Sequence, residues 1–312
     1  MGFELTILGC GSATPTSTQH PTAQLLQMAE RFFLIDCGEG TQQQLRKYNL
    51  RMGKINHIFI SHMHGDHYFG LIGLISSFHL MNRKNDLHIY GPSALKEVID
   101  VQLRVSDTRL VYPLHFHLIE ENDQKLLFED KRVEVHCFPL KHSIAVSGFL
   151  FKEKVKERNI IRAKIDAYNI PLFEINKIKK GADFTTAAGE IIPNADLTID
   201  PPKALSYAFC TDTAYMEKTA DFVRDADVLY HESTFLQADI KRARKTKHAT
   251  AEQAAKVALA ANTRMLLLGH FSVRYDDNKL FENEAKIIFE NVTATKEGMR
   301  IIATQNEINA QF

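Results

Sequence analysis

Residue types that bind metal ions are concentrated directly after the apolar segment 55–60. The run Ser61-His62-Met63-His64-Gly65-Asp66-His67 places three imidazoles and one carboxylate within six residues. Imidazole and carboxylate bind zinc and related divalent cations, and such a group resists burial unless a cation holds it. Alternation along a strand would place His62 and His64 on one face, with Asp66 and His67 on the following turn. The spacing therefore predicts a metal site and argues against a histidine-rich surface loop.

Three further candidate ligands each follow a predicted strand. They are His142 after 132–138, Asp212 after 204–210 and His270 after 264–269. Each residue alone would more often be structural. Because the loops at the carboxyl ends of strands build the sites of open α/β sheets, three candidates in the same context favour one shared site.

The histidine motif resembles the signature of metallo-β-lactamase-fold hydrolases. That resemblance implies an α/β protein, a four-layer αββα sandwich that binds two zinc ions per chain at one edge. It assigns the ligands as follows: His62, His64 and His142 to one zinc, Asp66, His67 and His270 to the other, and Asp212 to a bridge between them. A hydroxide between the metals would be the nucleophile, since zinc lowers the pKa of bound water to about 7.

Five other stretches resemble ribonuclease Z, the family of tRNA 3′-processing endonucleases. They are 8–12, 36–42, 230–234, 247–250 and 269–275, and the last contains Arg274 as a further candidate site residue. The resemblance implies cleavage of precursor tRNA on the 3′ side of the discriminator nucleotide, leaving a tRNA 3′-hydroxyl and a trailer 5′-phosphate. It also implies a homodimer in which an inserted arm of one subunit, a segment that protrudes from the domain, holds a tRNA that the other subunit cleaves.

The chemistry of phosphodiester cleavage gives two more residues a role. The departing ribose oxygen is a poor leaving group at neutral pH and needs a proton. We expect His248 to supply that proton, with Glu232 holding the imidazole oriented and cationic. Asp66 is expected to take the proton of the attacking water. His248 and Glu232 could instead be an ordinary surface histidine and an exposed carboxylate.

The expected architecture is a single domain, 1–312, because strand and helix patterns alternate through both halves without a linker. Strands are predicted at 3–8, 31–36, 55–60, 86–90, 132–138, 204–210, 227–231, 264–269 and 298–304, and helices at 93–105, 250–262 and 281–291. Thr250 and Gln253 have capping-box spacing. Residues 152–203 break this rhythm with four prolines, which predicts a protruding insertion.

The net charge of zero conceals two basic regions. The 38 basic and 38 acidic residues balance, yet segment 152–184 has nine basic against five acidic residues, and 241–247 has five basic and none acidic. Positive charge of this kind binds phosphates without reading sequence. The candidate RNA contacts are Lys154, Lys156, Arg158, Lys177, Lys179 and Lys180 in the insertion, and Arg242, Arg244 and Lys245 beside His248. The insertion is thus expected to be a tRNA-binding arm.

Two other functions stay open. One is a hydrolase of the same fold acting on an aryl sulfate, a cyclic nucleotide or a thioester, and the other is an RNA-binding scaffold with a decayed site. Without an apolar run of about 18 residues, we expect a cytoplasmic protein that does not enter membranes. The four separate cysteines predict buried thiols.

One histidine pattern is set aside. His115 and His117 alternate along a strand-like segment and could bind metal, but the pattern offers no third ligand nearby. His57 and His88 lie within predicted strands and are expected to be packed or to face solvent. We therefore expect no metal there.

Overall fold

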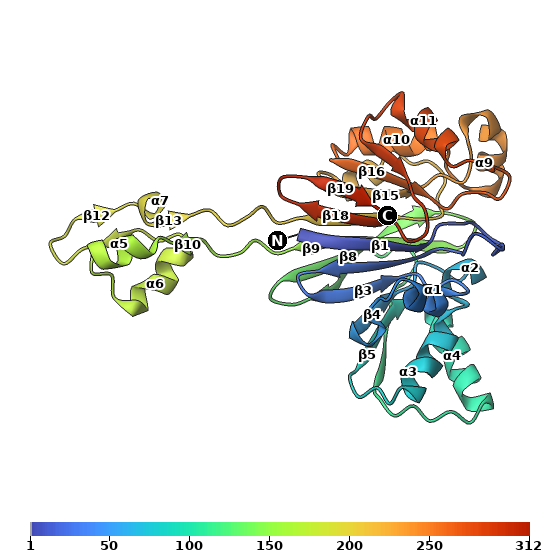
Figure 1. Cartoon of the computed structure of the whole chain (residues 1–312), viewed down its shortest axis with the longest axis horizontal. Helices are drawn as coiled ribbons and strands as arrows, with labels where there is room; N and C mark the ends of the chain where they lie inside the picture. Colours follow the sequence, from blue (N-terminus) through green and yellow to red (C-terminus); the bar gives the residue numbers. More distant parts are fainter. Residues whose placement is uncertain (1) are drawn as a thin grey trace.

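Two β-sheets pack face to face with helices on both outer surfaces, as the computed structural model, which describes residues 2–312, shows (Figure 1). This confirms the predicted αββα sandwich. The first sheet has the order β19-β18-β1-β2-β3-β4-β5-β6. Its strands are Gly2–Gly9 (β1), Ala23–Met28 (β2), Arg31–Ile35 (β3), Ile55–Phe59 (β4), Leu87–Gly91 (β5), Leu114–Leu118 (β6), Arg300–Thr304 (β18) and Ile308–Gln311 (β19). Strands β3 to β6 are parallel.

The second sheet has the order β17-β16-β15-β14-β9-β8-β7. Its strands are Lys125–Glu129 (β7), Val133–Lys141 (β8), Ala145–Glu153 (β9), Ser206–Cys210 (β14), Val228–Glu232 (β15), Met265–Gly269 (β16) and Val292–Ala294 (β17). Strands β14 to β17 are parallel, and β9 joins β14 antiparallel. In both sheets the parallel strands direct their carboxyl ends toward one edge of the sandwich, which is where catalytic loops collect in α/β proteins.

Helices cover the outer faces of both sheets (Figure 1). Over the first sheet lie Thr41–Lys47 (α1), Gly65–Tyr68 (α2), Leu71–Leu80 (α3) and Ser93–Val105 (α4), with the 3-10 turn Met52–Lys54 (η1). Over the second lie Thr219–Phe222 (α8), Ile240–Thr246 (α9), Ala251–Ala260 (α10) and Lys279–Lys286 (α11), with Gln237–Asp239 (η2). Across residues 2–312, no helix combines the length and the apolar content needed to cross a membrane.

Aromatic side chains fill the space between the sheets. Phe59 lies edge-on to Phe151 with ring centroids 5.3 Å apart, and Phe149 packs beside them from the second sheet. Edge-to-face pairs of this kind add to the free energy gained by burying the rings. The four cysteines are buried free thiols, as predicted. Burial raises the pKa of Cys10 to about 12, so this thiol stays protonated.

Most predicted elements are present with small shifts at their ends. The capping box is confirmed, because Thr250 Oγ1 accepts from the Gln253 amide while the Gln253 side chain accepts from the Thr250 amide. The predicted helix 281–291 ends earlier, at Lys286. Its extension was wrong because the Asn291 carbonyl accepts a hydrogen bond from Leu266 N at the start of the pairing between β16 and β17.

The segment between β9 and β14 extends away from the sandwich (Figure 1). It contains Asn159–Ile160 (β10), Arg162–Ala167 (α5), Leu172–Lys179 (α6), Phe184–Thr185 (β11), Ile191–Ile192 (β12), Asn194–Leu197 (α7) and Thr198–Ile199 (β13). A small apolar cluster of its own, which includes Ile178 and Leu197, stabilises the tip. The tip therefore packs without contact to the main core.

Candidate active site

All seven predicted metal ligands lie together at the edge where the parallel strands end. His62 and His64 do not alternate along a strand as predicted, since β4 ends at Phe59 and both histidines lie in the following loop. His64 is the extended residue that precedes α2, and α2 carries Asp66 and His67. The other three ligands follow the strands after which they were expected: His142 follows β8, Asp212 follows β14 and His270 follows β16.

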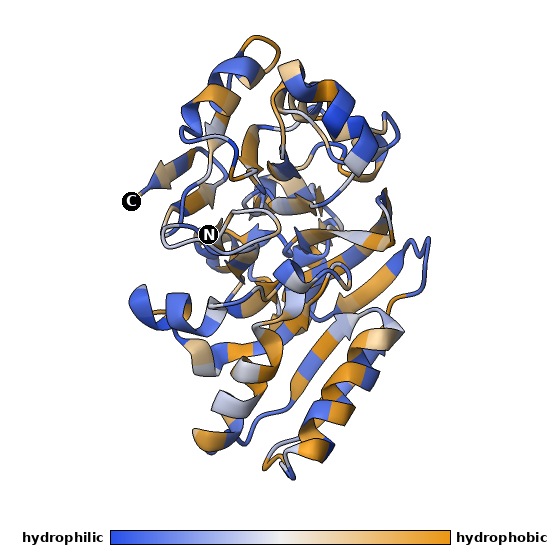
Figure 2. Ribbon diagram, turned by 90° about the vertical axis from the view of Figure 1, so that its right-hand side faces the viewer, coloured by the Kyte–Doolittle hydropathy of each residue, from blue (hydrophilic) through white to orange (hydrophobic). Residues whose placement is uncertain are grey.

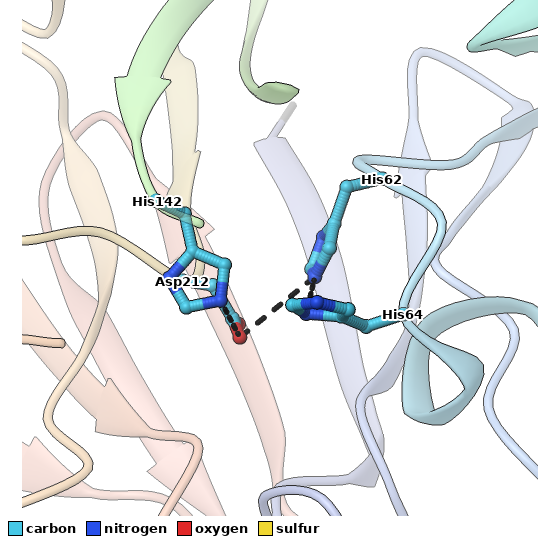
Figure 3. Close-up of side chains that lie close together, drawn as sticks. All are labelled: His62, His64, His142 and Asp212. Carbon is cyan, nitrogen blue, oxygen red and sulfur yellow. Dashed lines mark hydrogen bonds and ion pairs between the residues drawn. The ribbon is translucent and has the colours of Figure 1, made fainter. Parts of the chain in front are cut away.

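One set of ligands is formed by three histidines and one oxygen of Asp212 (Figure 3). His62 Nε2 lies 3.1 Å from His64 Nδ1. Asp212 Oδ2 lies 3.8 Å from His62 Nε2 and 3.7 Å from His142 Nε2. Tetrahedral ligands at zinc-like bond lengths are separated by about 3.4 Å, so these spacings suit a single cation.

The other oxygen of Asp212 faces the remaining ligands. Asp212 Oδ1 lies 3.2 Å from His67 Nε2 and 3.1 Å from His270 Nε2. Asp66 Oδ2 lies 3.4 Å and 3.5 Å from the same two nitrogens. Both Nε2 atoms are buried without a hydrogen-bond partner, which is costly unless they bind a cation. The donor set therefore fits a second metal ion, with Asp212 shared between the two.

The outer nitrogen of each of four histidines is held by a neighbouring oxygen. His142 Nδ1 donates to the Lys247 carbonyl at 2.9 Å, and His67 Nδ1 lies 2.7 Å from Asp36 Oδ2. Likewise His62 Nδ1 is 2.9 Å from Ser61 Oγ, and His270 Nδ1 is 2.9 Å from Thr234 Oγ1. Partners of this kind fix the imidazole tautomer and turn Nε2 toward the metal.

Asp36 is a site residue that the sequence analysis did not identify. Its carboxylate accepts from the Ser61 amide and hydroxyl and contacts His67, entirely inside the protein. Burial raises the pKa of Asp36, an effect that the His67 imidazole opposes. The available signal was its position directly after β3, next to the loop that follows β4.

The carboxylates near His67 are stable in their charged form only if positive charge lies close to them. Although burial disfavours the charged form of Asp66, His67 and His270 hold the pKa of its carboxyl well below its usual range. Burial acts against protonated His67 too, yet Asp212, Asp36 and Asp66 together raise the pKa of His67 well above normal. Two divalent cations would supply the positive charge that this group of carboxylates requires.

His248 and Glu232 form a pair beside the metal ligands. His248 Nδ1 lies 2.8 Å from Glu232 Oε1, and Glu232 also accepts from the Thr213 amide and from Thr234. Burial lowers the pKa of His248, but Glu232 outweighs it and raises that pKa to about 9. The structure thus brings His248 and Glu232 together, and the buried carboxylate orients the imidazole and favours its protonated form.

A cavity of about 760 Å³ opens above the ligands. Arg242, Lys245 and Arg274 line it, whereas Arg244 on α9 does not. Lys247 lines it too and donates from Nζ to the His142 carbonyl. Among residues 2–312, Arg242, Lys245 and Arg274 have no ion-pair partner, so their charge is available to an anion. The exposed Phe69 ring, three residues after Asp66 in the chain, also lines the cavity.

The predicted RNA contacts in the protruding segment are far from this cavity and mostly paired. The pairs are Lys154 with Glu129, Arg158 with Asp200, Lys177 with Glu174 and Lys179 with Glu157. Lys156 is half-buried and Lys180 is exposed. An anion at the segment would therefore have to compete with nearby carboxylates.

Comparison with known proteins gives two family matches. Residues 3–294 match the family model described as anti-Pycsar protein Apyc1. The chain is also 46% identical over 299 residues to ribonuclease Z of Bacteroides thetaiotaomicron, covering 96% of this chain and 95% of that protein. Ribonuclease Z of Bacteroides fragilis is 44% identical and covers 96% and 98%.

A solved structure supports the same relationship. The crystal structure of human tRNase Z, short form, superposes with a TM-score of 0.70 at 28% identity, covering 96% of this chain and 98% of that one. Nearly the whole chain is therefore shared with these relatives, and its fold is shared with human tRNase Z.

Replacing Asp212 tests whether this carboxylate joins the two ligand sets. Asp212→Ala removes an oxygen from both sets and is expected to reduce the bound zinc by more than half, measured by elemental analysis after dialysis against zinc. Asp221→Ala, which removes an exposed carboxylate on α8, is the control and should retain the wild-type content. Unchanged zinc in Asp212→Ala would contradict the shared ligand.

Proposed function

Because the chain belongs to the ribonuclease Z family and to the family described as anti-Pycsar protein Apyc1, we propose that it is a metal-dependent endoribonuclease that processes the 3′ end of precursor tRNA. Cleavage falls on the 3′ side of the discriminator nucleotide, leaving a tRNA 3′-hydroxyl and a trailer 5′-phosphate. The observation that carries this proposal is the His248–Glu232 pair beside two joined sets of metal ligands in one cavity.

The metal ions are zinc, two per chain, in this proposal. Five imidazoles and two carboxylates are the donors that favour zinc over magnesium or calcium, which prefer oxygen ligands alone. When bound, the pair of ions activates a water and neutralises charge on the phosphate. Asp66 lies beside this position, where its carboxylate accepts the proton of the attacking water while the Ala13 amide donates to Oδ2 at 2.8 Å.

His248 provides the proton for the leaving ribose oxygen. Its Nδ1 is occupied by Glu232, so Nε2–H is the remaining donor, and His248 is one of the residues that line the cavity. The unpaired Arg242 and Lys245 line the same cavity and bind the phosphates that flank the scissile bond. Small aryl sulfates and cyclic nucleotides, the substrates of the alternative hydrolase, would not need this row of cations.

The protruding segment acts as the tRNA-binding arm in this proposal. It leaves the sandwich at the opposite end of β9 and β14 from His142 and Asp212. A tRNA whose body is bound at the tip of one chain would therefore lie far from the cavity of the same chain. This supports cleavage of that tRNA by the partner in a homodimer. The homodimer and the cytoplasmic location stay predictions.

The direct test is to map the ends of the products. Purified protein with zinc is incubated with a precursor tRNA carrying a 3′ trailer, and we expect one cut after the discriminator nucleotide with the stated end groups. Intact precursor together with rapid hydrolysis of a cyclic nucleotide or an aryl sulfate would overturn the proposal in favour of the alternative hydrolase.

Removing the imidazole of His248 should separate catalysis from metal binding. We expect His248→Ala to lower the rate of precursor cleavage by about 10²- to 10⁴-fold, the usual contribution of a general acid. The zinc content should stay at the wild-type level, measured by elemental analysis. Loss of zinc in this variant would show that His248 is a ligand and not the proton donor. His136→Gln, a change on β8 away from the cavity, is the control.

Deleting residues 155–198 should separate tRNA binding from chemistry. The tip has its own apolar cluster, so its removal leaves the main core intact. We expect the deletion to abolish cleavage of precursor tRNA while hydrolysis of a nitrophenyl phosphodiester continues, both followed by initial rates. Loss of both activities with an unchanged melting temperature would contradict the assignment of the arm to tRNA binding.

A further inference from the structure

A second group of histidines lies on the parallel strands of the first sheet. His57 on β4 pairs in register with His88 on β5, and His88 pairs in turn with His115 on β6. His117 follows two residues later on the same face, opposite Tyr90. Because parallel neighbours in register align their side chains, three strands place their imidazoles in one row.

The imidazoles in this row are in close contact. The ring centroids of His57 and His88 are 5.1 Å apart and those of His88 and His115 are 4.7 Å apart, both nearly parallel. His88 Nδ1 lies 3.0 Å from His117 Nε2. His115 Nε2 lies 3.0 Å from Asp86 Oδ2, so a carboxylate joins the cluster.

This geometry corrects the expectation drawn from sequence. The pair His115 and His117 was set aside because the sequence pattern offers no third ligand, whereas the structure places two candidate ligands beside His115. The missing ligands, His88 and Asp86, are on the neighbouring strand and in the turn before it, 27 or more residues earlier in the chain. Only the pairing of β5 with β6 brings them together.

We propose that Asp86, His88 and His115 form a site for one divalent cation of the zinc and nickel class, separate from the catalytic metals. One donor atom from each of the three lies within 4.8 Å of the others. Two imidazoles and a carboxylate favour Zn²⁺ or Ni²⁺ over Mg²⁺ or Ca²⁺. Small side-chain rotations bring such donors to bonding distance, and water completes the coordination.

The neighbourhood of the site supports metal binding. A metal binds the neutral form of imidazole. Burial and the neighbouring His115 lower the pKa of His88, and burial and His88 lower the pKa of His117. His88 Nδ1 contacts His117 Nε2 at 3.0 Å, which restricts the orientation of the His88 ring. The side chains of Asp86 and His115 are half exposed, so a cation can enter from solvent.

The site is distinct from the catalytic centre. His57 precedes His62 by five residues along β4 and the loop after it, which is roughly 16 Å of extended chain. His88 and His115 are each the second residue of their strand, so the site lies toward the opposite end of the strands from the catalytic ligands. A cation here would join the edge strand β6 to β5. It would stabilise β6, which pairs with a neighbouring strand on one side only.

Zinc stoichiometry and thermal stability test this proposal. We compare wild type with the His88→Gln/His115→Gln double variant, both depleted by chelator and then titrated with Zn²⁺ by calorimetry. The double variant is expected to bind one equivalent fewer, to lose part of the zinc-dependent rise in melting temperature, and to keep wild-type cleavage of precursor tRNA.

A control variant tests whether zinc binds the three-residue cluster specifically or any histidine near the surface. His136→Gln on β8 removes an imidazole that pairs with a single carboxylate, Glu134, at 3.2 Å, and should leave the stoichiometry unchanged. Asp86→Asn changes a half-exposed carboxylate to an amide of the same shape, keeps both imidazoles, and is expected to weaken binding of the extra equivalent. Equal zinc stoichiometry and affinity in wild type, Asp86→Asn and the double variant would overturn the proposal.

Discussion

The active site depends on the buried carboxylate of Asp212. Its two oxygens face two separate sets of imidazoles, and the groups around it include two further acids, the buried Asp36 and the half-buried Asp66. Burying this much charge is costly unless positive charge neutralises it, and the orphaned nitrogens of His67 and His270 show where that charge belongs. Cations bound here would therefore stabilise this edge of the molecule as well as supply its chemistry.

The sandwich supplies the precision that this arrangement needs. Ligands come from the ends of strands in both sheets, and the aromatic core between the sheets fixes their separation. Hydrogen bonds between the ring nitrogens and Asp36, Ser61, Thr234 and the Lys247 carbonyl then orient the rings. Glu232 orients His248 in the same way. Its buried, fully hydrogen-bonded carboxylate favours the protonated form of His248, whereas the imidazoles that bind metal must be neutral.

Distance separates the tasks of the chain. The catalytic ligands lie at one end of β9 and β14, and the protruding segment leaves from the other end.

The helical layers of Figure 2 show alternating polar and apolar residues, as expected for helices that cover a sheet on one side and face water on the other. The histidine row on β4 to β6 is a third location, and its chemistry is independent of the first two.

Sequence alone determined the local features. The ligand motif at 62–67, the capping box at Thr250 and most strands follow from residue types within a few positions of each other. The other ligands and the pair of His248 and Glu232 were expected from their positions after strands and from the family resemblance. Tertiary structure decided which distant residues meet: Asp36 beneath His67, and His88 beside His115. The physical reason is that parallel strands are joined by connections of about 20 to 30 residues. The register between two such strands decides which side chains meet, and no periodic pattern in the sequence reveals that register.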